Sequence, residues 1–180
     1  MSISSLKSIK GWVFDLDGVL VDSEPLHMQA WVEALRRHQI ELGPEWFQIG
    51  LGMVDFKFYE RIAEAYNLDP QDHTYLEEKH ETFRQMIQSG LPLVPGIEKL
   101  LERLRGNVLM AVATSSGRTF LDFVLHQKNW ADLFQATFSR SEIDSPKPAP
   151  EVYLTACAGL GLSPAECVAV EDTPIGLQSA

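Results

Sequence analysis

The 180-residue sequence predicts an α/β fold, with a doubly wound parallel-sheet (Rossmann-like) core and an inserted helical subdomain. Short apolar runs bounded by turn residues are typical of buried strands. Such runs lie at residues 11–16, 108–114, 136–138 and 167–170. The segments between them repeat apolar residues with the period of amphipathic helices. Strands that alternate with helices predict a parallel sheet covered on both faces.

The first strand is GWVFDL, which Gly18 ends. A helix is expected to begin near Asp22 or Ser23, because either side chain can cap it and Pro25 suits the first turn. Apolar residues then follow the spacing of one buried helical face, which predicts a core stripe. Its members are Met28, Trp31, Val32 and Leu35.

An inserted subdomain is expected between the first two strands. Helical patterns cover residues 56–66 and 74–87, with the turn-rich NLDPQD between them. The whole stretch is too long for a single crossover helix, and structureless loops of that length are rare. The predicted division is therefore a Rossmann-like core at 1–23 and 91–180 and a helical subdomain at 24–90.

The remaining elements alternate regularly. A helix opens at Pro95–Gly96, and VLMAVATSSG then reads as a strand buried on both faces. A helix at 118–127, a strand at 136–138 and the loop SRSEIDSPKPAP follow, and a further helix starts at Glu151. The last predicted element is CVAVEDT, an apolar strand that acidic residues follow.

Composition excludes several classes of protein. Hydrophobic residues at 45% and charged residues at 22% are typical of a globular protein. A net charge of −10 argues against nucleic acid as the partner, because phosphate backbones bind basic surfaces. No apolar run reaches the length of a membrane span, and MSISSLKSIK lacks a signal-peptide core. Cys157 and Cys167 are expected to be buried free thiols, as is usual in a reducing cytoplasm. The protein is expected to be cytoplasmic and monomeric.

Polar side chains gather where the predicted strands end. Ligands bind beyond the carboxyl ends of parallel strands, so these residues are expected to converge on one site. They are Asp15, Asp17, Thr114, Ser115, Glu171 and Asp172, joined by Lys147 from its loop.

The carboxylates of this group need a compensating charge. Two unit charges about 4 Å apart repel by roughly 4 kcal/mol at an effective dielectric of about 20. Asp15, Glu171 and Asp172 would therefore raise their own pKa values or bind a cation. Oxygen ligands without histidine or cysteine suit Mg²⁺ better than zinc. Lys147 and the Thr114 hydroxyl beside them form an anion site for a phosphoryl group.

Four motifs in order, DLDGVLVDSE, VATSS, SPKPAP and VEDTPIG, make the chain resemble the haloacid dehalogenase superfamily. The resemblance runs from Trp12 onward and is closest to the branch of beta-phosphoglucomutase and small sugar-phosphate phosphatases. It implies that the inserted helices are an alpha-helical cap. It also implies that the core continues beyond Ala180, so the C-terminal part is expected to be truncated.

The resemblance implies a phosphatase that uses Mg²⁺ and an aspartyl-phosphate intermediate. Asp15 would be the nucleophile and Asp17 the general acid, which also reaches the metal through its backbone carbonyl. Thr114, Ser115 and Lys147 would hold the phosphate. Asp172 would bind the metal, with Glu171 as a direct or water-mediated helper.

Other interpretations stay open at this stage. His27 either lies on a helix face or takes part in proton or substrate handling. A phosphosugar mutase would share every core residue and differ in the cap, where Gly50 to Phe58 offers only Lys57 and Asp55 would repel a second phosphate. A dehalogenase would lack Asp17, and a truncated non-catalytic relic is the least favoured. The expected partner is a small phosphorylated metabolite, a sugar or polyol phosphate.

Overall fold

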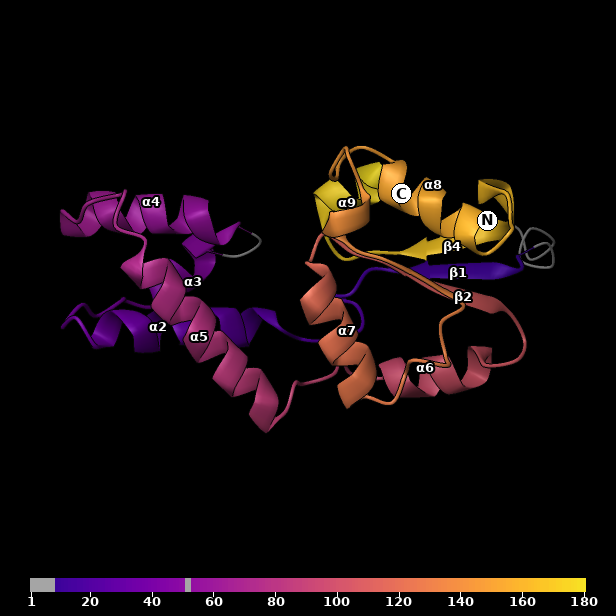
Figure 1. The fold of residues 1–180 in the computed structure, drawn as a ribbon, viewed down its shortest axis with the longest axis horizontal. Coiled ribbons are helices and arrows are strands. Elements are labelled where there is room, and N and C mark those ends of the chain that lie inside the picture. The colour runs from indigo at the N-terminus through magenta and orange to yellow at the C-terminus, as the bar shows by residue number, and fades with distance from the viewer. Residues whose placement is uncertain (1–8, 51–52) are drawn as a thin grey trace. The chain divides into compact units, whose positions relative to one another are not determined.

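A computed structural model describes residues 9–50 and 53–180 of the chain. The chain divides into two compact units (Figure 1). One unit contains the residues up to Asp22 together with Leu93–Ala180, and the other is Ser23–Pro92. The predicted α/β class, with a parallel sheet and an inserted helical cap, is confirmed. The segment MSISSLKSIK lies largely outside the described residues.

The core unit is built on a four-stranded parallel sheet with the order β3-β2-β1-β4. The strands are β1 (Gly11–Phe14), β2 (Leu109–Ala113), β3 (Ala136–Phe138) and β4 (Cys167–Val170). In this register Phe14 lies opposite both Val112 and Val170. The residues that follow β1, β2 and β4 therefore emerge together at one edge of the sheet.

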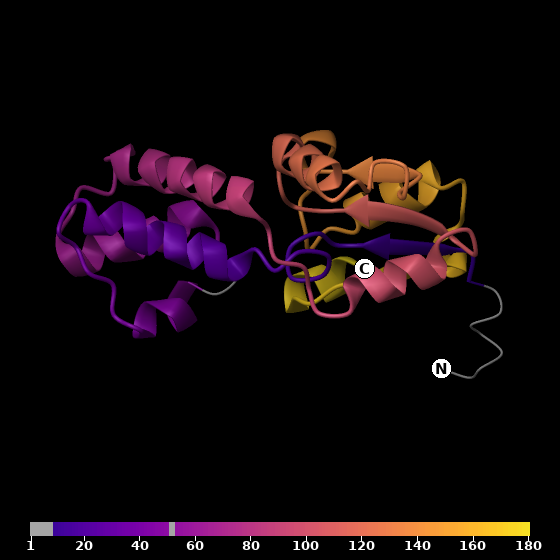
Figure 2. The same cartoon turned by 90° about the horizontal axis from the view of Figure 1, so that it is seen from below.

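Helices cover both faces of this sheet. The helices of the core unit are α6 (Ile97–Leu104), α7 (Arg118–Gln127), α8 (Glu151–Gly159) and α9 (Pro174–Ser179), with short 3₁₀ turns at Arg140–Glu142 and Pro164–Glu166. The helix α8 packs against β1 and β2, and α6 lies on the opposite side of the sheet (Figures 1 and 2).

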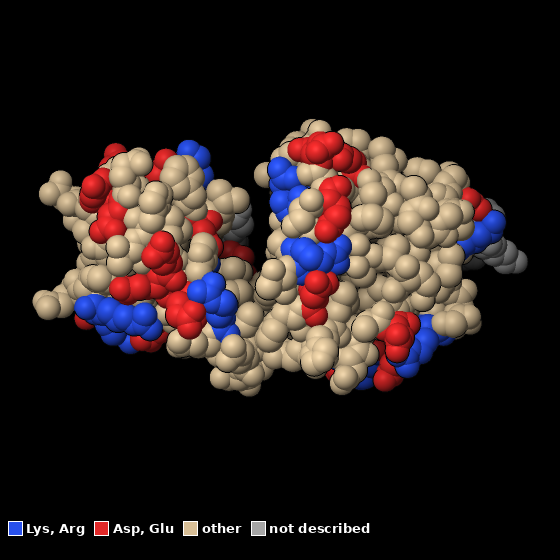
Figure 3. Space-filling model, viewed as in Figure 1, with Lys and Arg blue, Asp and Glu red and all other residues tan. Residues whose placement is uncertain are grey.

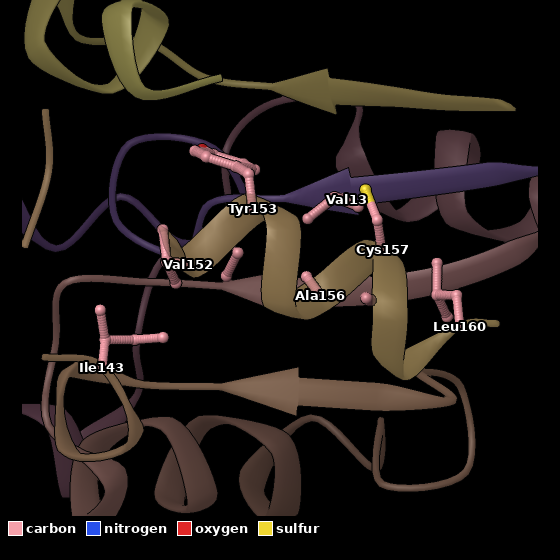
Figure 4. Packing of buried hydrophobic residues seen from close by; sticks show 9 residues of the cluster. Val13, Ile143, Val152, Tyr153, Ala156, Cys157 and Leu160 are labelled. Atoms are coloured by element: carbon pink, nitrogen blue, oxygen red, sulfur yellow. The ribbon is translucent and has the colours of Figure 1, made fainter. Parts of the chain in front are cut away.

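Alternation along β1 separates the two halves of the core, because successive strand side chains point to opposite faces. Val13 belongs to a buried cluster under α8 (Figure 4). Its neighbour Phe14 instead meets the ring of Phe134 edge-on, with the centroids 6.2 Å apart. Both side chains are almost fully buried, as expected for a strand that is apolar on both faces.

The cap unit consists of helices. They are α2 (Glu24–Arg36), α3 (Glu45–Gly50), α4 (Asp55–Tyr66) and α5 (Thr74–Ser89). Met28, Trp31 and Leu35 of the predicted stripe on α2 are buried, whereas Val32 is half-buried. The Trp31 ring stacks parallel to that of Tyr59 at 6.1 Å. Sequence reading missed α3, because its six residues are too few to show a helical period.

Two local expectations differ from the structure. Ser23 occupies the N-cap position of α2, but its side chain makes no capping hydrogen bond because its backbone is already helical. Cys157 is buried as expected, whereas Cys167 is only half-buried, since β4 lies at an edge of the described sheet. Both thiols are free.

Surface charge is mixed on the face shown in Figure 3, where acidic and basic side chains lie beside one another in each unit. Within the described residues, no helix combines the length and the apolar character that crossing a membrane demands.

Candidate active site

The register of the sheet assembles the site. Asp15 directly follows β1, Thr114 follows β2, and Glu171 with Asp172 follows β4. Because Phe14 is paired with Val112 and Val170, these polar residues leave the sheet at the same level. The predicted convergence at the carboxyl edge follows from this pairing.

Lys147 reaches this edge from the loop before α8 and contacts the acids directly. Its Nζ donates to Asp15 Oδ1 at 2.9 Å and also to Glu171 Oε1. Only 7% of the lysine side chain and 11% of the Asp15 side chain are exposed. Removal from water strengthens such pairs when both partners keep their hydrogen bonds. Lys147 is thus held against Asp15 at the sheet edge.

Glu171 has hydrogen-bond partners on both carboxylate oxygens. Oε1 accepts from Lys147 and from the hydroxyl of Tyr153 at 2.9 Å, and Oε2 accepts from the backbone amides of Asp172 and Thr173. Burial alone would raise the pKa of Glu171, but the hydrogen bond from Lys147 leaves it below its ordinary value. The main charged partner of Glu171 is therefore Lys147.

Asp172 lies against the backbone of the loop that follows β1. Gly18 has a φ of +75°, and a Cβ added there would fall 2.0 Å from Asp172 Oδ2. A side chain at this position would displace the carboxylate, so glycine is required for both its conformation and its lack of volume. The absence of a Cβ lets Asp172 approach the Asp15 loop.

The acids outnumber the cations at this edge. Burial raises the pKa of the Asp15 carboxyl to about 7; Lys147 opposes the rise, while Glu171 and Asp17 add to it. Burial and the nearby Glu171 also raise the pKa of Asp172. An additional positive charge would stabilise the ionised form of both carboxyls.

The arrangement fits a hard divalent cation. Asp15, Glu171 and Asp172 each place one carboxylate oxygen within 4.8 Å of the others. An all-oxygen set without histidine or thiolate is the donor set that Mg²⁺ prefers. Because both oxygens of Glu171 already accept hydrogen bonds, Asp15 and Asp172 are the better candidates for direct ligands.

Asp17 points its carboxylate at a different partner. Ser116 Oγ donates to Asp17 Oδ2 at 2.5 Å. Thr114 is buried, and its Oγ1 accepts from the backbone amide of Ser116 at 2.9 Å, which shapes the turn after β2. Ser115, on the same turn, is exposed. The loops after β1 and β2 are therefore tied together beside Asp15.

His27 belongs to the cap unit. Its Nδ1 lies 2.8 Å from Lys79 Nζ, and its ring stacks on Phe83 at 3.9 Å. Lys79 has a fully buried side chain and donates to Asp55 Oδ2 at 2.6 Å. His27 is thus part of a polar cluster within the cap, defined by His27, Asp55, Lys79 and His80.

Sequence reading missed two contacts of the site. The ring of Tyr153 lies on the apolar face of α8, and its hydroxyl reaches Lys147 and Glu171. Ser116 adjoins the predicted Thr114 and Ser115 but gave no separate signal. A tyrosine six residues after a loop lysine is the pattern that could have indicated the first contact.

Comparisons with known proteins agree with this geometry. The profile of the haloacid dehalogenase-like hydrolases matches residues 9–180. Fructose-1-phosphate phosphatase YqaB of Escherichia coli K12 is 28% identical over 94% of this chain and 90% of its own. Beta-phosphoglucomutase of Bacillus subtilis 168 is 28% identical over 95% of this chain and 78% of its own.

A solved structure shows the same fold. CbbY from Rhodobacter sphaeroides, crystallised in complex with phosphate, matches with a TM-score of 0.74 at 25% identity, over 95% of this chain and 81% of its own. The profile match spans nearly the whole chain, so the protein belongs to the haloacid dehalogenase-like hydrolase family. It is an enzyme of that family, as its motifs predict.

Proposed function

We propose that the protein is a Mg²⁺-dependent phosphatase that hydrolyses a small phosphate monoester through an aspartyl-phosphate on Asp15. The observation that carries this proposal is the buried Asp15 carboxylate, bonded to Lys147 and lying beside Asp172 at the carboxyl edge of the sheet. This arrangement supports the roles of nucleophile for Asp15, phosphate-binding cation for Lys147 and metal ligand for Asp172.

A sugar or polyol phosphate is the proposed substrate. The fructose-1-phosphate phosphatase and the beta-phosphoglucomutase among the relatives are both named for sugar phosphates. The CbbY structure was obtained with bound phosphate. These names support a small phosphorylated metabolite as the partner of the site.

In the first half-reaction, a carboxylate oxygen of Asp15 attacks phosphorus and the ester P–O bond breaks. Asp17 gives its proton to the departing alcohol oxygen, so a neutral alcohol leaves. Lys147 binds a phosphoryl oxygen and offsets the charge that develops there. Thr114 and the backbone near Ser115 orient the remaining phosphoryl oxygens.

In the second half-reaction, water attacks the phosphorus of the aspartyl-phosphate. Asp17, now ionised, takes a proton from that water, and the bond between phosphorus and Asp15 breaks. Inorganic phosphate and the free Asp15 carboxylate result. Mg²⁺, held by Asp15, Asp172 and the backbone carbonyl of Asp17 with Glu171 nearby, would supply the positive charge that lets two anions approach.

The sequence could not show the partners of Asp55. From the sequence, Asp55 is expected to repel a second phosphate. In the structure it accepts hydrogen bonds from Lys79, His80 and Trp31, so its charge is already compensated. Lys57, the cation of the same segment, pairs with Glu60. Residues 51–52 of this segment lie outside the described residues.

Net hydrolysis remains the proposed reaction. A mutase must hold the second phosphate of a bisphosphate intermediate, which requires an available cation. The charged side chains that the structure describes in residues 53–58 both have partners outside this segment, since Lys57 pairs with Glu60 and Asp55 pairs with Lys79. Such pairing supports release of phosphate over its transfer within a sugar.

The test is a panel of phosphate esters assayed with Mg²⁺ and then with a chelator. Turnover of sugar or polyol monophosphates should require Mg²⁺, return when it is restored, and be poorly supported by Ca²⁺, whose looser coordination shell misplaces the nucleophile. Full turnover in chelator would disprove the metal assignment. Absence of hydrolysis for every ester would disprove the phosphatase.

A second assay separates hydrolysis from transfer. The enzyme is incubated with a hexose 1-phosphate and a trace of the corresponding bisphosphate. Inorganic phosphate should appear faster than hexose 6-phosphate. The opposite order would establish a mutase.

A further inference from the structure

Tyr153 contacts the candidate active site with its hydroxyl, although its ring is packed among apolar side chains. It extends from α8 within the buried cluster beneath that helix, and 4% of the residue is exposed. Figure 4 shows its hydroxyl end pointing away from Val13, Ala156 and Cys157. The ring therefore belongs to the hydrophobic core, while the hydroxyl extends beyond it.

The hydroxyl bridges the two charged partners of the site. It donates to Glu171 Oε1 at 2.9 Å and accepts from Lys147 Nζ at 3.2 Å. The same Nζ lies 4.9 Å from the centroid of the Tyr153 ring, within cation–π range. One side chain thus contacts the ammonium with both its ring and its oxygen.

The three contacts of Lys147 match the three protons of an ammonium group. They go to Asp15, to Glu171 and to Tyr153. Glu171 Oε1 is shared between Lys147 and the tyrosine hydroxyl. Without that hydroxyl, Glu171 Oε1 would interact with Lys147 alone and draw the ammonium away from Asp15.

We propose that Tyr153 is a positioning residue, whose hydroxyl and ring hold the Lys147 ammonium beside Asp15 in the orientation that binds a phosphoryl group. This role rests on the proposed phosphatase function. Tyr153 supplies the neutral acceptor among the three partners of Lys147, at the end of a 3.2 Å contact. A phosphoryl oxygen can replace that acceptor while Lys147 keeps both carboxylates and the hydroxyl stays bonded to Glu171.

The direct test is Tyr153→Phe, which keeps the ring and removes the hydroxyl. Inorganic phosphate in the presence of Mg²⁺ is titrated by calorimetry, and KM is measured for the best ester of the panel. Both the phosphate Kd and KM should rise roughly tenfold, because without the hydroxyl Glu171 draws the Lys147 ammonium away from the phosphoryl oxygen and weakens one charge-assisted hydrogen bond. The kcat should change less, because Asp15 and Asp17 are retained.

The matched control is Tyr59→Phe. Tyr59 is also a buried tyrosine, but its hydroxyl donates to the Asp69 carbonyl within the cap unit. Its removal should leave the phosphate Kd and KM unchanged. Unchanged values in Tyr153→Phe as well would overturn the proposal without affecting the phosphatase, which the wild-type assay tests independently.

A double-mutant cycle separates positioning from a general structural effect. In a Lys147→Met background, adding Tyr153→Phe should not weaken phosphate binding further, because the tyrosine acts through the lysine. A further loss of similar size in that background would mean that Tyr153 acts on the fold, and would overturn the proposal. The cycle remains decisive if Tyr153→Phe lowers stability.

Discussion

Each unit of the protein buries a lysine against an aspartate, with opposite consequences for the acid. In the core, Lys147 contacts Asp15, and burial still raises the pKa of Asp15 to about 7. In the cap, Lys79 contacts Asp55; burial alone would raise the pKa of Asp55, but His80 and Lys79 bring it well below its ordinary value.

The balance of neighbouring charges explains the difference. Lys147 contacts Glu171 as well as Asp15, and the carboxylate of Asp172 lies close to both acids. Asp55 is the acid that Lys79 contacts, and it also accepts hydrogen bonds from His80 and Trp31. The core site has more acids than cations and can bind an additional cation. In the cap, the charge of Asp55 is already compensated, so this pair stabilises the fold.

The largest effect is expected from Asp15→Asn. It removes the proposed nucleophile, so kcat should fall by about a thousandfold or more while the fold is retained. Steady-state assay and circular dichroism measure the two results. Activity above a small fraction of wild type would show that Asp15 forms no covalent intermediate.

Asp17→Asn should separate the two classes of ester. Its loss removes leaving-group protonation, which contributes roughly a hundredfold or more for alkyl phosphates. An activated aryl phosphate has a good leaving group, so its kcat should suffer far less. Equal losses for the aryl and sugar phosphates would remove Asp17 from the role of general acid.

Asp55→Asn should show that the cap pair is structural. It leaves the buried ammonium of Lys79 without its carboxylate, which should lower the free energy of unfolding by about 3 kcal/mol. Denaturant unfolding measures the change. Glu60→Gln is the control, because it breaks an exposed pair with Lys57 and should cost under about 1 kcal/mol. Similar values for both variants would refute the distinction.

The smallest effect concerns pH in the presence of chelator. With its pKa raised to about 7, folded Asp15 holds a proton that the unfolded chain releases near pH 4, so its contribution to stability falls as pH rises between these values. Asp15→Asn should therefore raise Tm more at about pH 8 than at about pH 5, and the difference between the two pH values is measured by thermal unfolding.

Asp55→Asn provides the contrast in the same experiment. The lowered pKa of Asp55 makes its stabilisation complete above the ordinary carboxyl pKa of about 4, and the stabilisation is lost only as pH falls below that value. Its Tm deficit should therefore be present at about pH 5 and still present at about pH 8. Loss of the deficit at about pH 8 would contradict the assignment.

Much of the site could be predicted from the sequence, because strand ends are visible in it. An apolar run followed by acids locates Asp15 and Asp172, and parallel pairing brings them together without any knowledge of side-chain contacts. The buried stripe around Trp31 is equally visible, since a helical face has a fixed period.

Contacts between distant side chains could not be predicted in this way. Lys79 and Asp55 lie on different helices, and nothing in either helical pattern indicates that the lysine is buried against the aspartate. The ring of Tyr153 matches the apolar period of α8, and this period does not indicate that its hydroxyl contacts Glu171. Such contacts depend on the packing of elements, which the period of one element does not contain.

At Gly18 and Gly176, the main chain leaves space that the acidic side chains of the site occupy. A Cβ on Gly18 would fall 2.0 Å from Asp172 Oδ2, and one on Gly176 would fall 1.9 Å from the carboxyl carbon of Glu171. Both carboxylates therefore rest in recesses of the backbone, with few rotamers open to them. An incoming cation would lose little affinity to the ordering of these ligands, since folding has already restricted them.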